Sequence, residues 1–482
     1  MKYHLAIDIG ASSGRHILGH VEDGKIVLEE VFRFDNSQIR KDGHDCWDYE
    51  ALSRSVIAGI AKCKELGKLP TTVGIDTWGV DFILLDAFGR PCSDMVAYRD
   101  KRTEGADALV EAHISREELY SRCGIQKMLF NSIYQLAALK QEHPEQLERA
   151  ERFLMVGEYL NYVLTGKMAN EYTNATTGNL VNARTKDWDF EVIEKLGLPR
   201  RIFGRLEMPG TTLGDFSSAV QAEVGFNAKV VLPATHDTGS AFLAVPARDD
   251  RAVYISSGTW SLLGVENSEP ITSPEALAAN FTNEGGAWYR FRFLKNIMGL
   301  WMIQSIRREL NGVNYVEGKT AVTSWKLDDY EPGRKYSFND LESAARAAAD
   351  FAGRVDVIDA RFLSPDSMIA EVLAAADTRP ATVGELIQCV YASLADCYAK
   401  MIANLSAITG KTYTSINIVG GGSKDGYLNE LTARATGLEV FAGPTEGTAI
   451  GNLLIQFIAG GIFADLAEAR AAISRSFDVR KV

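Results

Sequence analysis

The segment from Asp8 to Arg15 combines a carboxylate, two glycines, two hydroxyls and a cation within eight positions. Asp8 ends a short apolar strand, where burying its charge is costly unless a partner compensates it, and a hydrated Mg²⁺ would do so. Ser12, Ser13 and Arg15, together with the backbone N–H groups around Gly14, could hold a phosphate. A tight hairpin with a turn-stabilising Asp is the alternative, and the coincidence of these residue types favours a phosphate site.

A second polar segment, His236-Asp237-Thr238, follows the apolar strand that starts at Val230. Asp237 could be the N-cap of a helix that begins in the small residues after it, which is a common position for Asp. It could instead remain ionised at the helix N-terminus and accept the proton of a substrate hydroxyl. The residues by themselves leave both interpretations open.

A third segment, Gly420-Gly421-Gly422, joins a predicted strand over residues 415–419 to a predicted helix over residues 426–436. Three consecutive glycines are entropically costly to order, so the close approach of a ligand to the backbone explains them better than chance. A plain strand-to-helix turn is the alternative.

A helix is predicted from Asn296 to Leu310, where Asn296 and Gln304 interrupt an apolar series. Polar side chains in such a helix usually face solvent. The same solvated position is the ordinary expectation for three cations whose roles are open, namely Arg99, Arg292 and Lys295.

The residues around the first segment predict a strand, a turn and a second strand. Apolar runs predict strands over residues 3–9, 15–21 and 25–34, with a hairpin turn at Asp23-Gly24. A Rossmann glycine loop would open a helix, and a P-loop would need Gly-Lys-Ser or Gly-Lys-Thr, so both are excluded. A helix over residues 47–67 and strands over 73–76 and 80–86 follow, an order that suggests a ribonuclease-H-like domain.

The second half of the chain repeats this order. Strands are predicted over residues 252–256 and 260–265 around a Ser-Gly-Thr turn, followed by a long helix over residues 383–408. We therefore expect an internal duplication in an α/β fold, with domains 1–243 and 244–482. The last helices could pack back on the first domain.

Composition excludes several classes of partner. The 482 residues carry a net charge of −12, which argues against a nucleic-acid or anionic-membrane partner. The six cysteines are scattered without a Cys-x-x-Cys pair, so zinc is not expected and a reducing compartment is. The first apolar run ends at Asp8, too early for a signal peptide, and we expect a cytoplasmic protein.

Taken together, nine stretches resemble the FGGY carbohydrate kinases, in family order along nearly the whole chain. These stretches are AIDIGASSGR (6–15), GIDTWGVDFILLD (74–86), AYRDKRT (97–103), EYTNATTGNLVN (171–182), THDTGSA (235–241), SSGTWSLLG (256–264), FTNEGG (281–286), LKNIMGLWMIQ (294–304) and VGGGS (419–423). A single glycine-rich turn would be a weak signal, whereas the set is specific.

The resemblance implies two ribonuclease-H-like domains of the actin and sugar-kinase superfamily that flank a central cleft. It implies transfer of the γ-phosphoryl group of MgATP to the C1 hydroxyl of L-rhamnulose, with Asp237 as general base. By motif it assigns His236, Thr238, the backbone at Gly79 and Asn296 to the sugar, Ser12, Ser13, Gly14, Arg15, Thr259, Gln304, Gly421 and Gly422 to the nucleotide, and Asp8 to Mg²⁺.

Other members of the family act on other acceptors, so L-fuculose, xylulose and glycerol are the alternatives. Gly79 leaves room where a glycerol-specific relative would place an Arg, which argues against glycerol. An actin-like ATPase or a non-catalytic sugar sensor is an alternative from a different functional class, and the presence of Asp237 argues against the sensor. A monomer or a homodimer is expected.

Overall fold

The computed structural model describes residues 2–247, 249–313 and 325–482. Its contacts divide the chain into two compact units. The first comprises Met1–Pro246, Val265–Leu294 and Glu446–Phe477, and the second comprises Ala247–Gly264, Lys295–Thr445 and Asp478–Val482. Our predicted single boundary after residue 243 differs from this grouping, because the 265–294 stretch contacts the first unit. One such contact is the bond from the Gly285 N–H to Thr176 Oγ1.

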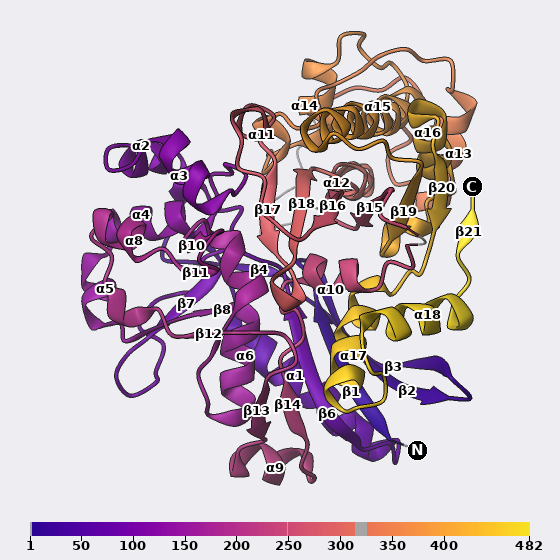
Figure 1. Cartoon of the computed structure of the whole chain (residues 1–482). Helices are drawn as coiled ribbons and strands as arrows, with labels where there is room; N and C mark the ends of the chain where they lie inside the picture. Colours follow the sequence, from indigo (N-terminus) through magenta and orange to yellow (C-terminus); the bar gives the residue numbers. More distant parts are fainter. Residues whose placement is uncertain (1, 248, 314–324) are drawn as a thin grey trace. The chain divides into compact units, whose positions relative to one another are not determined.

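The first unit is built on a six-stranded sheet with the order β13-β14-β6-β1-β2-β3 (Figure 1). Strands β1 and β2 are antiparallel, whereas β6 runs parallel to β1 and β14 runs parallel to β6. The strands of this sheet are β1 (Tyr3–Ile9), β2 (Ser13–Glu22), β3 (Lys25–Asp35), β6 (Pro70–Thr77), β13 (Thr212–Asp215) and β14 (Lys229–Val231). The predicted strand-turn-strand start is confirmed.

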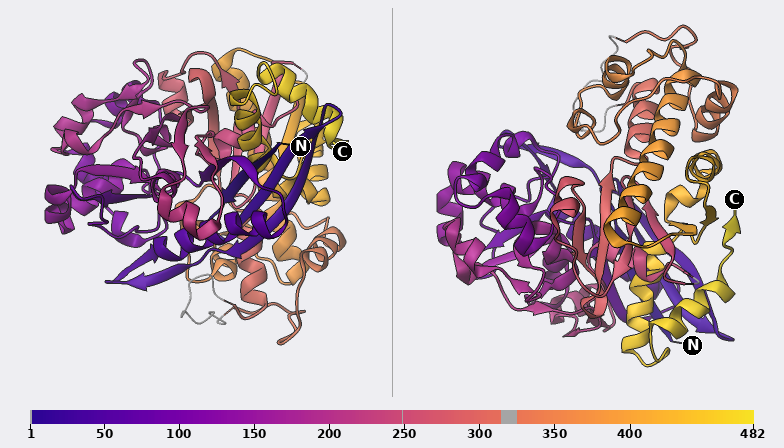
Figure 2. Two further views of the ribbon diagram at one scale, coloured as in Figure 1. Left: turned by 90° about the horizontal axis from the view of Figure 1, so that it is seen from below. Right: turned by 45° about the horizontal axis from the view of Figure 1, so that its top comes forward.

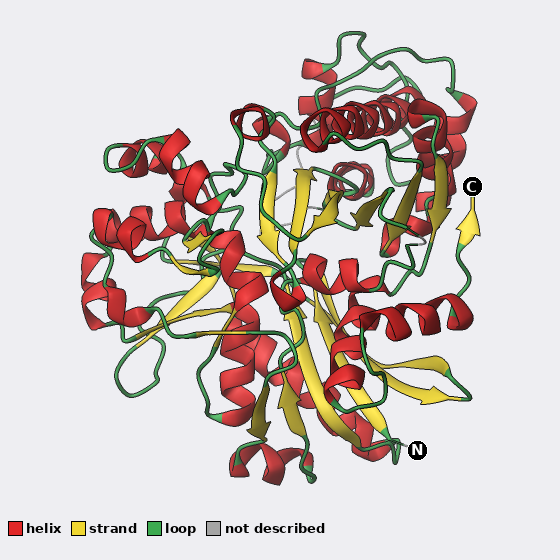
Figure 3. Ribbon diagram, viewed as in Figure 1, coloured by secondary structure: helices red, strands yellow, loops and turns green. Residues whose placement is uncertain are grey.

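Shorter strands and the helices complete the first unit (Figure 3). The shorter strands are β4 (Gln38–Lys41), β5 (His44–Trp47), β7 (Phe82–Leu85), β8 (Arg152–Met155), β9 (Asn170–Glu171), β10 (Val181–Asn182), β11 (Asp187–Trp188), β12 (Leu206–Glu207), β17 (Thr282–Gly285) and β18 (Phe291–Ile297), which begins in this unit. The helices are α1 (Tyr49–Glu65), α2 (Ala106–Glu111), α3 (Arg116–Cys123), α4 (Ser132–Glu142), α5 (Pro144–Arg149), α6 (Val156–Thr165), α7 (Tyr172–Ala175), α8 (Phe190–Lys195), α9 (Ser218–Val224), α10 (Asp237–Leu243), α11 (Pro274–Ala278), α17 (Gly447–Ala459) and α18 (Leu466–Ser476).

Helices from the two ends of the chain cover opposite faces of the main sheet. Nε2 of His16 in β2 donates to the Val56 carbonyl in α1, whereas Ile17 belongs to a buried cluster with Leu453 of α17. Successive side chains of a strand point to opposite faces, so α1 and α17 lie on different sides. Figure 2 shows α17 and α18, in yellow, beside the first strands, in indigo.

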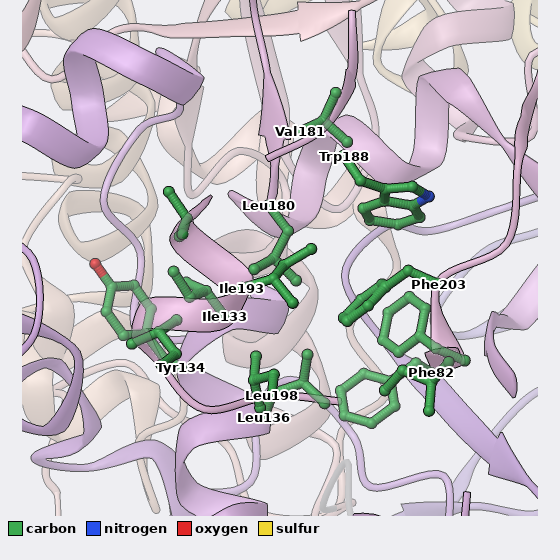
Figure 4. Packing of buried hydrophobic residues seen from close by; sticks show 14 of the residues in the cluster. Phe82, Ile133, Tyr134, Leu136, Leu180, Val181, Trp188, Ile193, Leu198 and Phe203 are labelled. Atoms are coloured by element: carbon green, nitrogen blue, oxygen red, sulfur yellow. The ribbon is translucent and has the colours of Figure 1, made fainter. Parts of the chain in front are cut away.

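A separate hydrophobic core lies under the helices α2 to α8 (Figure 4). Its aromatic rings pack closely, with centroids 4.8 Å apart for Phe82 and Phe153 and 4.9 Å apart for Trp188 and Phe203. Burying each such side chain stabilises the fold by about 1.5–3 kcal/mol. The predicted strand over residues 80–86 is shorter than expected, since β7 starts at Phe82 and pairs with β8 outside the main sheet. This core therefore anchors the chain directly after residue 81.

The second unit repeats the arrangement around β15. Strand β15 pairs antiparallel with β16 and parallel with β19, and β20 runs parallel to β19. Its elements are β15 (Ala252–Ser257), β16 (Ser261–Asn267), β19 (Ser415–Val419), β20 (Glu439–Ala442), β21 (Arg480–Lys481), α12 (Trp301–Leu310), α13 (Phe338–Ala347), α14 (Met368–Ala375), α15 (Val383–Thr409) and α16 (Gly426–Thr436). The mixed α/β class and the second strand-turn-strand are confirmed.

The predicted helix from Asn296 is wrong at its start. Asn296 lies in β18, and the helix α12 begins only at Trp301. Gly299 separates them with a φ of +55°, and an added Cβ there would lie 2.5 Å from the Ser261 backbone nitrogen. The close approach of Gly299 to the Ser261 backbone thus separates the strand from the helix. No local sequence pattern indicates this contact, because the two segments are distant in the chain.

The six cysteines are all free. Within the described ranges, no helix combines the length and the apolar character that crossing a membrane requires.

Candidate active site

Two carboxylates lie side by side at the end of the main sheet of the first unit. Asp8 of β1 is paired in register with Asp76 of β6, on parallel strands whose carboxyl ends share one edge. Asp8 is buried, and its Oδ2 accepts a hydrogen bond of 2.7 Å from the Arg15 guanidinium. Arg15 also contacts Glu446, directly before α17. The guanidinium therefore compensates the buried charge of Asp8.

Asp76 was missed in the sequence analysis. Its side chain is fully buried, and its Oδ2 accepts a hydrogen bond of 2.5 Å from the Asn452 amide. Its Oδ1 has no hydrogen-bond partner among the described residues. Burial, and then the nearby charge of Asp8, hold the pKa of Asp76 well above its ordinary value. The sequence does contain a signal for this residue. In Gly74-Ile75-Asp76, as in Ala6-Ile7-Asp8, an Asp stands at the end of a short apolar strand.

The predicted phosphate turn is a tight and internally bonded structure. The Gly10 N–H donates to the Ser13 carbonyl over 2.9 Å, and the Asn36 N–H donates to the Ser12 carbonyl. Gly14 has a packing reason, since a Cβ there would lie 2.1 Å from the Phe34 ring. Backbone hydrogen bonds and the packing of Gly14 against Phe34 therefore hold the turn in this conformation.

Asp237 follows β14, next to β6 in the sheet. It is the first residue of α10, and His236 occupies the N-cap position, so the N-cap interpretation of Asp237 is wrong. Its Oδ1 accepts hydrogen bonds from the Thr238 N–H at 2.5 Å and the Thr238 hydroxyl at 3.1 Å. A third of the Asp237 side chain remains exposed. Desolvation raises the pKa of Asp237 above its ordinary value, His236 opposes that rise, and the Asp8 charge adds to it.

Glu171 organises the backbone before Asp237 and was missed as a site residue. It is completely buried, and its Oε2 accepts hydrogen bonds from the Thr235 N–H at 3.1 Å and the Thr235 hydroxyl at 2.7 Å. The same carboxylate accepts bonds from Thr173 and Asn174 in α7. One buried acceptor thus joins α7 to the segment that carries Asp237, a pairing that only the fold creates.

His236 contacts a buried ion pair from the β17–β18 hairpin. Its Nδ1 lies 3.1 Å from Nη1 of Arg292 and 3.3 Å from Oε2 of Glu284. Its Nε2 lies 3.4 Å from Oδ1 of Asp237.

The solvated surface position predicted for the three cations of open role is wrong, since Arg99, Arg292 and Lys295 are only 5%, 1% and 4% exposed.

The backbone around Gly79 is held in a strained turn. Val80 has a φ of +68°, which is unusual for a β-branched residue and is associated with functional sites. Its N–H donates to Thr177 Oγ1 over 3.1 Å, and its carbonyl accepts from Ser132 Oγ over 2.6 Å. A Cβ on Gly79 would lie 3.0 Å from Thr177. The turn is thus fixed on both sides.

The second unit holds the other predicted residues. The Thr259 carbonyl, in the β15–β16 turn, accepts from the Trp301 N–H over 2.9 Å, and Gln304 lies one turn further along α12. Of the three glycines, Gly422 is required by packing, since a Cβ would lie 1.9 Å from Ser257 Oγ. A Cβ on Gly421 would meet nothing within 4 Å. Gly421 is therefore the position of this loop that is open to a ligand.

The oxygen ligands around Asp8 suit a hard cation. Mg²⁺ is usually bound through one or two carboxylates, waters and substrate phosphates. Asp8 and the unpartnered Oδ1 of its neighbour Asp76 supply such oxygens. In the part of the chain that the structure describes, no cluster of three or more His, Cys, Asp or Glu is placed to hold a metal.

Two family models match the chain in succession. The N-terminal domain of the FGGY family of carbohydrate kinases matches residues 3–244, and its C-terminal domain matches residues 253–460.

Three relatives that match over nearly their full length are rhamnulokinases. The rhamnulokinase of Halalkalibacterium halodurans is 48% identical, covering 100% of this chain and 98% of the relative. The rhamnulokinases of Bacillus subtilis and Bacteroides thetaiotaomicron are each 40% identical, covering 99% of this chain and 94% of the relative.

Solved structures share the fold at low identity. A ligand-bound xylulose kinase from Lactobacillus acidophilus has a TM-score of 0.77 at 16% identity, covering 100% of this chain and 93% of that one. A Plasmodium falciparum glycerol kinase with ADP has a TM-score of 0.76 at 14% identity, covering 99% and 94%. The two-domain FGGY sugar kinase fold is thereby shown for this chain.

Proposed function

This chain belongs to the FGGY family of carbohydrate kinases, and on that premise we propose that it phosphorylates the C1 hydroxyl of L-rhamnulose with Asp237 as general base. The protein is an ATP-dependent phosphotransferase with a sugar hydroxyl as acceptor. The choice of ketose rests on the name shared by the full-length relatives. The choice of base rests on the geometry at Asp237.

The partly exposed carboxyl group of Asp237 is the single observation that carries the assignment of the base. Oδ1 is held by Thr238, whereas Oδ2 has no bond among the described contacts, and a third of the side chain reaches solvent. The raised pKa makes Asp237 a better proton acceptor than an ordinary exposed Asp. A carboxylate with one fixed oxygen and one open oxygen is suited to receive a proton in a defined direction.

The sugar would lie against the segments around Asp237. His236, Thr238 and the backbone at Gly79 are proposed to hold the sugar, and Asn296 of β18 is proposed as a contact to the sugar or the ribose. The strained, doubly bonded turn at Val80 keeps the Gly79 backbone in one conformation. A rigid platform reduces the entropy that is lost on binding.

Two groups of residues are proposed as contacts of the nucleotide, as the resemblance assigns them. Ser12, Ser13, Gly14 and Arg15 belong to the first unit, and Thr259, Gln304, Gly421 and Gly422 to the second unit. Arg15 is held by Asp8 and Glu446, so a phosphate would compete with these carboxylates for the guanidinium. Asp8 would hold Mg²⁺. The metal, when bound, neutralises charge on the β- and γ-phosphates.

The chemical step is a direct transfer. As the C1 oxygen forms its bond to the γ-phosphorus, its proton passes to Asp237 Oδ2, and the bond from the γ-phosphorus to the bridging oxygen of ADP breaks. Phosphoryl transfer has a loose transition state, so the placement of the hydroxyl contributes more than the strength of the base. The products are ADP and the ketose 1-phosphate, and Asp237 later releases its proton to solvent.

Incubation of the purified protein with MgATP and separate ketoses tests the substrate. ADP formation is followed by a coupled assay with L-rhamnulose, L-fuculose, xylulose and glycerol, and the position of the phosphate is read by NMR. We expect the highest kcat/KM with L-rhamnulose and a C1 phosphate. A higher value with another acceptor, or a phosphate elsewhere on the sugar, would refute the assignment.

The Asp237→Asn variant tests the base. We expect kcat to fall about 10²- to 10⁴-fold, the usual contribution of a general base. Asp42→Asn is a matched control, since Asp42 is exposed in a turn with φ +47°, a conformation that Asn also tolerates. A sugar-dependent rate within a few-fold of the unaltered protein would exclude Asp237 as the base.

A further inference from the structure

Arg292 is a completely buried cation in β18, and each of its nitrogens has an acceptor. Its Nε and Nη2 both donate to the Gly285 carbonyl, over 3.1 Å and 2.9 Å. Its Nη1 lies 3.2 Å from Oε2 of Glu284 and 3.1 Å from Nδ1 of His236. The guanidinium is therefore fixed in one plane, between the hairpin backbone and the histidine.

This arrangement determines which ring nitrogen of His236 carries the proton. A guanidinium donates hydrogen bonds and cannot accept them, so Nδ1 of His236 must accept from Nη1 of Arg292. Oε2 of Glu284 lies 3.2 Å from Nη1 and 3.3 Å from Nδ1 of His236, but neither contact has the geometry of a hydrogen bond, so Nη1 of Arg292 remains the hydrogen-bonding partner of Nδ1. A proton on Nδ1 would instead point at the hydrogens of the guanidinium. The neutral ring is consequently protonated on Nε2, the nitrogen 3.4 Å from Oδ1 of Asp237.

We infer that Arg292 and Glu284 are positioning residues that hold His236 as the Nε2–H tautomer, so that its ring N–H is directed at Oδ1 of Asp237. The inference deepens the proposed function and rests on Asp237 acting there as the base. Oδ1 is then held by Thr238 and His236 together, and Oδ2 is kept for the substrate hydroxyl. In many catalytic triads a third residue likewise holds the histidine in one tautomer.

The position of these groups in the chain makes the inference specific. Glu284 and Arg292 face each other across the β17–β18 hairpin as a register pair, and His236 lies far from both in sequence. Glu284 is 4% exposed and Arg292 is 1% exposed. Solvent therefore cannot supply the alternative donor that would let His236 change its tautomer freely.

NMR of the unaltered full-length protein with ¹⁵N-labelled histidine tests the inference directly. The chain has 7 histidines, and the signals lost in His236→Gln identify those of His236. At pH 8 we expect a pyridine-type shift at Nδ1 and a pyrrole-type shift at Nε2. A pyrrole-type shift at Nδ1, or at both nitrogens, would overturn the inference.

Substitutions at Arg292 add a kinetic readout. In Arg292→Met, Glu284 becomes the only close partner of Nδ1, so we expect the ring to bind its proton there and kcat to fall about 10- to 100-fold, with an unchanged KM for ATP. Arg292→Lys retains a donor and should recover the Nε2–H tautomer and part of the lost rate. Arg290→Met, on the same hairpin but 45% exposed, is the matched control and should change neither quantity.

The two proposals fail separately. If Arg292→Met keeps the Nε2–H tautomer and the full kcat, the positioning role is excluded even where Asp237→Asn is inactive. If Asp237→Asn keeps its rate, the base assignment is lost while the tautomer measurement still stands. Should Arg292→Met not fold, the spectrum of the unaltered protein decides alone.

Discussion

In the first unit, the hairpin of β1 and β2 places Asp8 opposite Arg15, one pair before the turn. In the second unit, the hairpin of β15 and β16 places Ser256 opposite Leu262 at the equivalent pair. The parallel neighbours differ in the same way, since Asp8 is beside Asp76 of β6, whereas Ser256 is beside Val419 of β19.

The difference shows that one backbone arrangement supports two kinds of chemistry. Charged side chains at the carboxyl edge of the first sheet can hold a cation and accept a proton. The turns of the second sheet offer hydroxyls, backbone N–H groups and the open Gly421, which suit a phosphate without adding charge. We therefore expect the first unit to supply the carboxylates of the site and the second unit to add phosphate contacts that carry no charge.

Separate substitutions of the equivalent residues Asp8 and Ser256 should give the largest contrast in kcat. We expect Asp8→Asn to lower kcat about 10²- to 10³-fold, because the charge proposed to hold Mg²⁺ and to orient Arg15 toward the phosphates is lost. Ser256→Ala should change kcat only a few-fold, since no charge is removed. Steady-state rates over a range of Mg²⁺ concentrations measure both, and equal losses in the two variants would contradict the division of roles.

The Glu171 network should matter next, because it belongs to the acidic unit but has no exposed atoms. Glu171→Gln replaces one acceptor oxygen with an amide donor, which faces the Thr173 N–H if it takes the place of Oε1 or the Thr235 N–H if it takes the place of Oε2. We expect the free energy of unfolding to fall by about 1–3 kcal/mol and kcat to fall more than the KM for sugar rises. Denaturation curves with kinetics on the folded fraction test this. A destabilised variant with unchanged kcat would limit Glu171 to a role in folding.

In the second unit, substitutions of the neighbouring Gly421 and Gly422 should distinguish an effect on packing from an effect on ATP binding. Gly422→Ala brings a Cβ against Ser257 and should destabilise the protein by about 1–3 kcal/mol. Gly421→Ala meets no neighbour and should leave stability unchanged while raising the KM for ATP. Thermal unfolding and ATP titration measure the two effects. An unchanged KM in Gly421→Ala would remove Gly421 from the proposed phosphate contacts.

The last prediction concerns another buried carboxyl of the first unit, which affects stability and not the reaction. Burial raises the pKa of Glu158, in α6, to about 8. The folded protein then keeps this proton between about pH 4.5 and pH 8 while the unfolded chain loses it, so this group lowers stability as pH rises, by at most about 1.4 kcal/mol per pH unit. Denaturation at several pH values should show that the slope is reduced in Glu158→Gln. An identical slope would mean that Glu158 is ionised in the fold.

Local pattern was enough to predict most strands near the site. The apolar run before Asp8 and the hairpin turn at Asp23-Gly24 predicted β1 to β3, and the strand over residues 415–419 is β19 as expected. These elements are readable because period and turn chemistry act over a few residues. The start of α12 was misplaced because Gly299 packs against the Ser261 backbone, a contact between distant segments.

The sequence by itself determined the family, the order of the elements and the residues that carry reactive groups, since these depend on residue type and spacing. Only the tertiary structure decided that Arg292 is buried against His236, that Glu171 binds Thr235 and that Asp76 stands beside Asp8. Charges in separate segments acquire their partners only when strands and hairpins meet. Burial then decides whether a cation is a solvated surface group or the donor that fixes a histidine.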